Sequence, residues 1–71
     1  MVLGIYGASG LGREFLDSAE RINKVKCCWE EIVFVDDTTE KQGTTFDGAL
    51  ILSFEDALTK YGKDSIEFVI G

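Results

Sequence analysis

Residues 7–14 read GASGLGRE and follow an apolar run, VLGIY, at residues 2–6. An amphipathic pattern begins directly after them. This order predicts a buried strand, a glycine-rich turn and a helix, an arrangement that directs free backbone N–H groups toward an anion at the helix N-terminus. We therefore expect this stretch to hold the diphosphate of a nucleotide or nucleotide-sugar.

The glycine spacing is G-x-x-G-x-G, and each residue type suits a phosphate-binding turn. Gly7 permits a tight turn, Gly10 lets the backbone approach a phosphate, and Gly12 permits close contact between helix and sheet. Ser9 adds a hydroxyl donor. The alternative is a strand–helix turn that is tight for structural reasons and binds nothing.

The first helix is predicted from Leu11, with Ser9 or Gly10 at its start and its end fraying near Asn23, and residues 24–30 are either a last helical turn or a loop to the next strand. The second helix is predicted over Phe54–Tyr61, capped by Ser53 and closed by Gly62. One face of the first helix should be apolar, because apolar residues recur there at helical spacing; they are Leu11, Phe15, Ala19 and Ile22, with Leu16 beside Phe15.

Short apolar runs predict four strands, and Thr38–Gly48 is predicted to be a loop. The strands are Val2–Tyr6, Ile32–Val35, Leu50–Leu52 and Ile66–Ile70. The element order β-α-β-β-α-β predicts a small α/β domain with a parallel sheet of spatial order 3-2-1-4. The glycine turn then lies at the C-terminal edge of the central strand, where open α/β sheets bind ligands.

Composition excludes several classes of function. With 71 residues and a net charge of −6, from 13 acidic and 7 basic residues, the chain repels nucleic acid. It has no apolar run long enough for a membrane span and no signal-peptide pattern, so we expect a cytoplasmic protein. Without His, and with only the adjacent Cys27 and Cys28, we expect no metal site and no catalytic residue in this chain.

Two acidic residues follow the second strand. Asp36 and Asp37 stand where a carboxylate reaches a ribose hydroxyl or a donor N–H of a base in folds of this class. Such a carboxylate also repels a 2′-phosphate, which disfavours NADP. The alternative is an Asx turn that ends the strand and leads into Thr38 and Thr39.

The run IYGASGLGRE at residues 5–14 resembles the opening of the sugar O- and N-acyltransferases of the sialic-acid and bacillosamine biosynthesis type. In that family a glycine-serine-glycine turn precedes a helix that starts with Gly-Arg-Glu or a similar triplet. FVDD at residues 34–37 and Ile70-Gly71 match further features, so the resemblance covers essentially the whole chain.

This resemblance implies a Rossmann-like N-terminal domain over residues 1–71 that binds a UDP-sugar. A separate left-handed β-helix domain of the full-length protein would bind acetyl-CoA, form homotrimers and carry the catalytic His. The chain alone would then be an inactive fragment of an acetyltransferase. The implied substrate-binding residues are Gly7, Ser9, Gly10 and Gly12 at the diphosphate or sugar, Asp36 and Asp37 at the uridine, and Ile70 and Gly71 beside the base.

Two other functions share these features. A NAD-binding half-domain of a dehydrogenase or epimerase would have the same glycines and acidic residue. A non-catalytic interaction module would have the same turn, but the turn would bind no ligand. Because no helix follows the last strand, one side of the sheet is poorly covered, so we expect a piece of a longer protein or self-association through the uncovered sheet face or edge.

Overall fold

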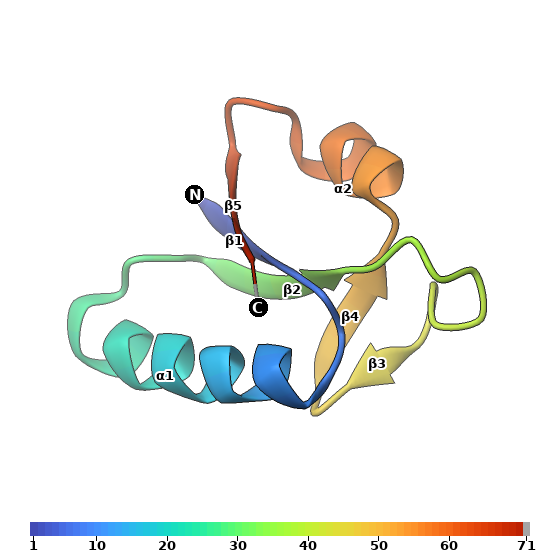
Figure 1. Ribbon diagram of the computed structural model, residues 1–71. Helices are drawn as coiled ribbons and strands as arrows, with labels where there is room; N and C mark the ends of the chain where they lie inside the picture. The colour runs from blue at the N-terminus through green and yellow to red at the C-terminus, as the bar shows by residue number, and fades with distance from the viewer. Residues whose placement is uncertain (71) are drawn as a thin grey trace.

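The computed structural model describes residues 1–70, which form one five-stranded sheet with a helix on each face (Figure 1). The sheet order is β3-β4-β2-β1-β5. Strands β4, β2, β1 and β5 are parallel, and β3 pairs with β4 in the antiparallel direction. In chain order the elements are β1 (Val2–Tyr6), α1 (Gly10–Lys26), β2 (Glu31–Val35), β3 (Thr45–Phe46), β4 (Ala49–Leu52), α2 (Phe54–Tyr61) and β5 (Ile66–Ile70).

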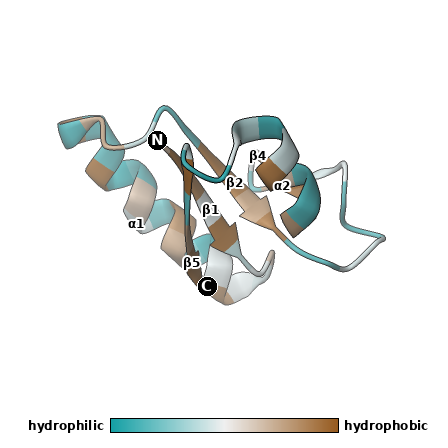
Figure 2. Ribbon diagram, turned by 90° about the horizontal axis from the view of Figure 1, so that it is seen from above, coloured by the Kyte–Doolittle hydropathy of each residue, from teal (hydrophilic) through white to brown (hydrophobic). Residues whose placement is uncertain are grey.

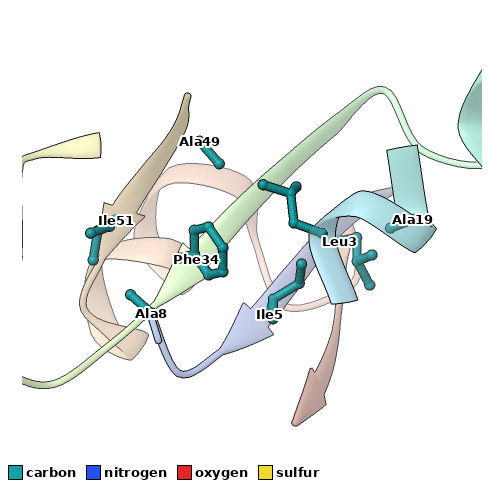
Figure 3. Packing of buried hydrophobic residues seen from close by; sticks show 8 residues of the cluster. Leu3, Ile5, Ala8, Ala19, Phe34, Ala49 and Ile51 are labelled. Carbon is teal, nitrogen blue, oxygen red and sulfur yellow. The ribbon is translucent and has the colours of Figure 1, made fainter. Parts of the chain in front are cut away.

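The core consists of two apolar layers, one under each helix. Alternate residues of the central strands point to opposite faces, so Leu3 and Phe34 pack toward α1 (Figure 3) while Val2 and Val33 pack toward α2. Both layers are nearly inaccessible to water. Figure 2 shows the apolar residues concentrated on β1 and β2. The unbroken apolar runs of these strands are therefore explained by burial on both faces.

The predicted α/β class is confirmed, and the four parallel strands have the predicted neighbours. The sheet differs in one detail, because the predicted loop Thr38–Gly48 contains β3. Asp47 and Gly48 join β3 to β4 with φ of 54° and 88°, the positive angles of a type I′ hairpin turn. The Asp-Gly pair that favours this turn was visible in the sequence. Phe46 of β3 packs against Phe34, with ring centroids 5.4 Å apart.

Helix α1 was predicted correctly, and residues after Asn23 form the last helical turn that was one of the two alternatives, but most of its predicted buried face was wrong. It continues past Asn23 to Lys26 and is closed by Cys27, whose backbone is left-handed and whose N–H donates to the Asn23 carbonyl. Its buried residues are Gly12, Leu16 and Ala19. The predicted face is largely wrong because the tight turn points Gly12 at the sheet, which turns Leu11, Phe15 and Ile22 outward.

Ser53 caps α2 as predicted, since its Oγ accepts a hydrogen bond from the Asp56 N–H at 3.0 Å. We expect Ser53→Ala to lower the free energy of unfolding by about 1 kcal/mol, because that N–H loses its acceptor. Urea denaturation followed by circular dichroism measures the loss. Thr59→Ala, on the exposed surface of the same helix, is the control and should leave stability unchanged or slightly higher. Equal effects of the two substitutions would contradict the capping role.

Candidate functional site

The glycine turn connects β1 to α1 at the C-terminal edge of the sheet, as predicted. Gly7 has φ of 110°, a conformation that favours glycine, and its N–H donates to the Val35 carbonyl at 2.8 Å. A Cβ built on Gly12 would lie 2.1 Å from the Gly7 carbonyl oxygen and 3.1 Å from the Phe34 ring. The helix can therefore begin this close to the turn and sheet only with glycine at position 12.

In the described part of the chain, no side-chain hydrogen bond caps the first turn of α1. Ser9 is the N-cap residue, with an extended backbone, and its hydroxyl makes no capping hydrogen bond within the described residues. The Arg13 N–H is the first to bond inside the helix, to the Ser9 carbonyl. The N–H groups of residues 10–12 thus have no intrahelical acceptor, and the helix dipole adds partial positive charge there. Such a turn suits an anion.

Asp36 fastens the β2–β3 connection to the glycine turn. Its Oδ2 accepts from the Ala8 N–H at 3.0 Å, and its Oδ1 accepts from the Thr38 N–H at 2.8 Å. These bonds, first from Thr38 and then from Ala8, and the Lys41 ammonium 3.7 Å away lower the pKa of Asp36 to about 2. The Asx turn weighed as the alternative role for Asp36 is therefore present. A contact of Asp36 with a ligand stays a prediction.

Asp37 is exposed beside the turn and accepts a hydrogen bond from the Tyr6 hydroxyl. This bond is the main reason that the pKa of Tyr6 lies above its ordinary value, with burial as the next cause. Tyr6 therefore remains a protonated donor at neutral pH. The pair places one phenol and one carboxylate at the same edge of the sheet as the glycine turn.

Lys41 is a residue of this site that the sequence reasoning missed. Its ammonium donates to the Ala8 carbonyl at 2.9 Å, and the neighbouring Gln42 amide donates to the Asp36 carbonyl at 3.2 Å. The hairpin brings them there, because the Gly43 N–H donates to the Ile51 carbonyl and folds the loop back. The Asp-Gly pair that predicts this hairpin is the one sequence signal that could have located Lys41.

An aromatic cluster adjoins the turn on the α2 side of the sheet. Phe54 lies between Tyr6 and Phe68, with ring centroids 6.3 Å and 5.0 Å apart. Phe54 is 40% exposed, so part of its ring faces solvent. Ile70, predicted to flank a base, ends β5 opposite Tyr6 and is 87% exposed. Gly71 lies outside the described residues, so its predicted role has no structural description.

Other features of the described residues do not compete with this site. A hollow of about 490 Å³ lies at the opposite edge of the sheet, but its lining includes Glu20, Glu30, Glu31 and Asp47, which would repel an anion. Within residues 1–70, His, Cys, Asp and Glu form no group of three that could hold a metal ion. Neither described helix has the length and apolar character needed to cross a membrane.

Comparison with protein families shows which family this chain belongs to. A family model described as the PglD N-terminal domain matches residues 2–71. The chain belongs to this family. The PglD N-terminal domain is that of PglD-type bacillosamine acetyltransferases, so the resemblance drawn from the glycine turn and FVDD is confirmed. No curated protein and no solved structure matches the chain.

Membership of this family indicates the class of enzyme to which such a domain belongs. The chain is the N-terminal domain type of an acetyltransferase, with a link to polysaccharide-related biosynthesis. The glycine turn, Asp36, Asp37 and Lys41 gather at one edge of this domain. They are therefore the residues on which a function for the PglD N-terminal domain is best tested.

Proposed function

We propose that this domain binds the nucleoside diphosphate part of a UDP-sugar and so positions the sugar for acetyl transfer. The observation that supports this most is the uncapped first turn of α1, which offers backbone donors at the sheet edge. The transfer itself, from acetyl-CoA to a sugar amine or hydroxyl with release of CoA, would be carried out by a second domain. We expect that domain to be the trimeric β-helix of the full-length protein.

The electrostatics of the turn favour a diphosphate despite the net charge of −6. The nearest carboxylate, Asp36, is balanced by two backbone donors and the Lys41 ammonium. The Lys41 side chain is still 44% exposed, so it has room for a phosphate oxygen. Lys41 and the dipole of α1 would then attract the diphosphate from two sides.

The uracil would lie toward Tyr6, Phe54 and Ile70, whose aromatic and apolar surfaces suit a flat base. Asp37 remains exposed for a ribose hydroxyl or the base N–H. Asp36 is a weaker candidate for gripping a ribose diol, because both its oxygens already accept backbone N–H groups. This arrangement supports UDP over NAD, which relies on such a carboxylate.

Isothermal titration with UDP, a UDP-amino-sugar, uridine and NAD tests the proposal. We expect heat of binding for UDP and the UDP-amino-sugar, weaker binding of uridine, and none for NAD. Tight NAD binding without UDP binding would overturn it and favour an oxidoreductase half-domain. No thermal shift with any nucleotide would also overturn it and favour an interaction module.

Lys41→Gln tests the diphosphate end of the site. We expect UDP affinity to fall about tenfold, since a charged hydrogen bond to phosphate is lost, while uridine affinity stays unchanged. Lys63→Gln is the matched control, because Lys63 is an exposed lysine between α2 and β5, away from the turn. An equal loss for uridine and UDP would show that Lys41 acts only by holding the loop.

A further inference from the structure

Helix α1 carries an apolar stripe on its outer side that nothing in residues 1–70 covers. Leu11, Phe15, Ile22 and Val25 are 64%, 40%, 47% and 81% exposed. Two shallow hollows lie along the stripe, one lined by Leu11, Glu14, Phe15 and Ser18 and the other by Arg21, Ile22, Val25 and Lys26. The helix lies on the outside of the fold (Figure 1), and apolar segments recur along it (Figure 2). Its outer side is therefore open to a partner.

The stripe has the spacing of a helix-pairing seam. Leu11, Phe15, Ser18, Ile22 and Val25 follow one another at intervals of four, three, four and three residues. This alternation keeps side chains in line along a helix that packs lengthwise against another helix. The sheet-facing residues Gly12, Leu16 and Ala19 follow the same alternation one residue later. One face of α1 thus serves the core and the adjoining face is left for a second helix.

The charges beside the seam favour an antiparallel copy of the same helix. Glu14 and Arg21 flank the seam on the side away from the sheet-facing residues. In an antiparallel pair these equivalent positions meet, so Glu14 of each copy faces Arg21 of the other. In a parallel pair they would instead face positions such as Gly12 and Ala19, which are buried in the core. The antiparallel alignment also sets the large Phe15 against the small Ser18.

We propose that the outer stripe of α1 is a self-association surface, on which a second copy of this chain docks its own α1 in the antiparallel direction. Phe15 packs against Ser18 of the second copy and Leu11 against its Ile22, each contact occurring twice under the two-fold symmetry. The surface is a helix face and not the sheet face or edge expected from the sequence. The proposal does not rest on UDP-sugar binding at the turn.

Sedimentation equilibrium over micromolar to millimolar chain concentration measures the association. We expect a monomer–dimer equilibrium that Ile22→Asp weakens more than about tenfold, because a charge would enter the seam. Glu55→Arg on the exposed start of α2 is the control and should leave the equilibrium unchanged. A monomer at all concentrations, or a dimer indifferent to Ile22→Asp, would overturn the proposal.

Charge reversal tests the pairing. Glu14→Arg alone and Arg21→Glu alone should each weaken the dimer about fivefold, since two attractive pairs become repulsive. The double variant should restore affinity to near its original value, because the signs are exchanged on both copies. Additive weakening in the double variant would refute the antiparallel contact.

Disulfide trapping tests the direction of the two helices. In a Cys27→Asn, Cys28→Ser background, chains with Leu11→Cys are mixed with chains carrying Ile22→Cys and oxidised mildly. The antiparallel alignment places position 11 beside position 22 and separates identical positions by about 16 Å along the axis. Mixed disulfides are therefore expected. A predominance of disulfides between identical chains would overturn the antiparallel arrangement.

Discussion

Gly12→Ala is expected to prevent stable folding of this domain. The added Cβ would lie 2.1 Å from the Gly7 carbonyl oxygen, which is backbone and cannot rotate away. The helix must then shift off the sheet, away from Phe34, and its contacts through Leu16 and Ala19 are disturbed. We expect a loss of at least about 3 kcal/mol, at the high end of overpacking costs. A small domain has few kcal/mol to lose.

Gly10→Ala supplies the matched control two residues earlier. A Cβ at Gly10 meets nothing within 4 Å, and alanine is the better helix former. We expect its urea midpoint to be equal to or above that of the original chain, while Gly12→Ala lacks a cooperative transition. If Gly12→Ala unfolded with the same midpoint as Gly10→Ala, the close contact between α1 and the turn would not exist.

Asp36→Asn is expected to have the second-largest effect, a loss of about 2 kcal/mol at neutral pH. The amide keeps one acceptor oxygen, but its NH2 group faces either the Ala8 N–H or the Thr38 N–H, and the ion pair with Lys41 is gone. Asp37→Asn is the control, because among residues 1–70 the exposed Asp37 accepts a hydrogen bond only from the Tyr6 hydroxyl. We expect it to cost much less.

The pH dependence of stability identifies Asp36 separately. Its pKa is about 2 in the folded chain against an ordinary 3.8, so folding favours the charged form. This stabilisation is complete above about pH 5 and is lost as the pH falls toward 2, by about 2 kcal/mol. The free energies of unfolding of the original chain and of Asp36→Asn should therefore converge as the pH is lowered from 5 to 2. Parallel curves would contradict the assigned bonds.

The sequence predicted those parts of the fold that depend on neighbouring residues. The unbroken apolar runs reveal strands buried on both faces, and the strand–turn–helix order locates the glycine turn. Ser53 predicts the start of α2 because its capping hydrogen bond joins it to a residue only three positions later. The PglD family match then confirms the resemblance that the turn and the paired aspartates had indicated.

The sequence did not predict features that depend on the rotation of a helix about its axis or on contacts between residues far apart in the chain. The apolar residues of α1 lie on two adjoining faces, and periodicity cannot say which faces the sheet; the Gly12 contact with the turn decides it. Lys41 was hidden because it meets Ala8 across 33 residues of chain, through a hairpin that was predicted to be a loop. The ligand roles of Gly7, Ser9, Gly10, Gly12, Asp36, Asp37, Ile70 and Gly71 stay predictions.

Ala8 is held at both its N–H and its carbonyl by Asp36 and Lys41, which lie in the connection after the neighbouring strand β2. The residues GASGLG alone therefore do not determine the conformation of the turn. The same six residues placed in another strand–helix junction would lack these two hydrogen bonds, and we expect the backbone at Ala8 to change conformation there. The shape of the turn is hence a property of the whole domain, and a graft of the glycine motif into another protein would need the β2–β3 connection as well.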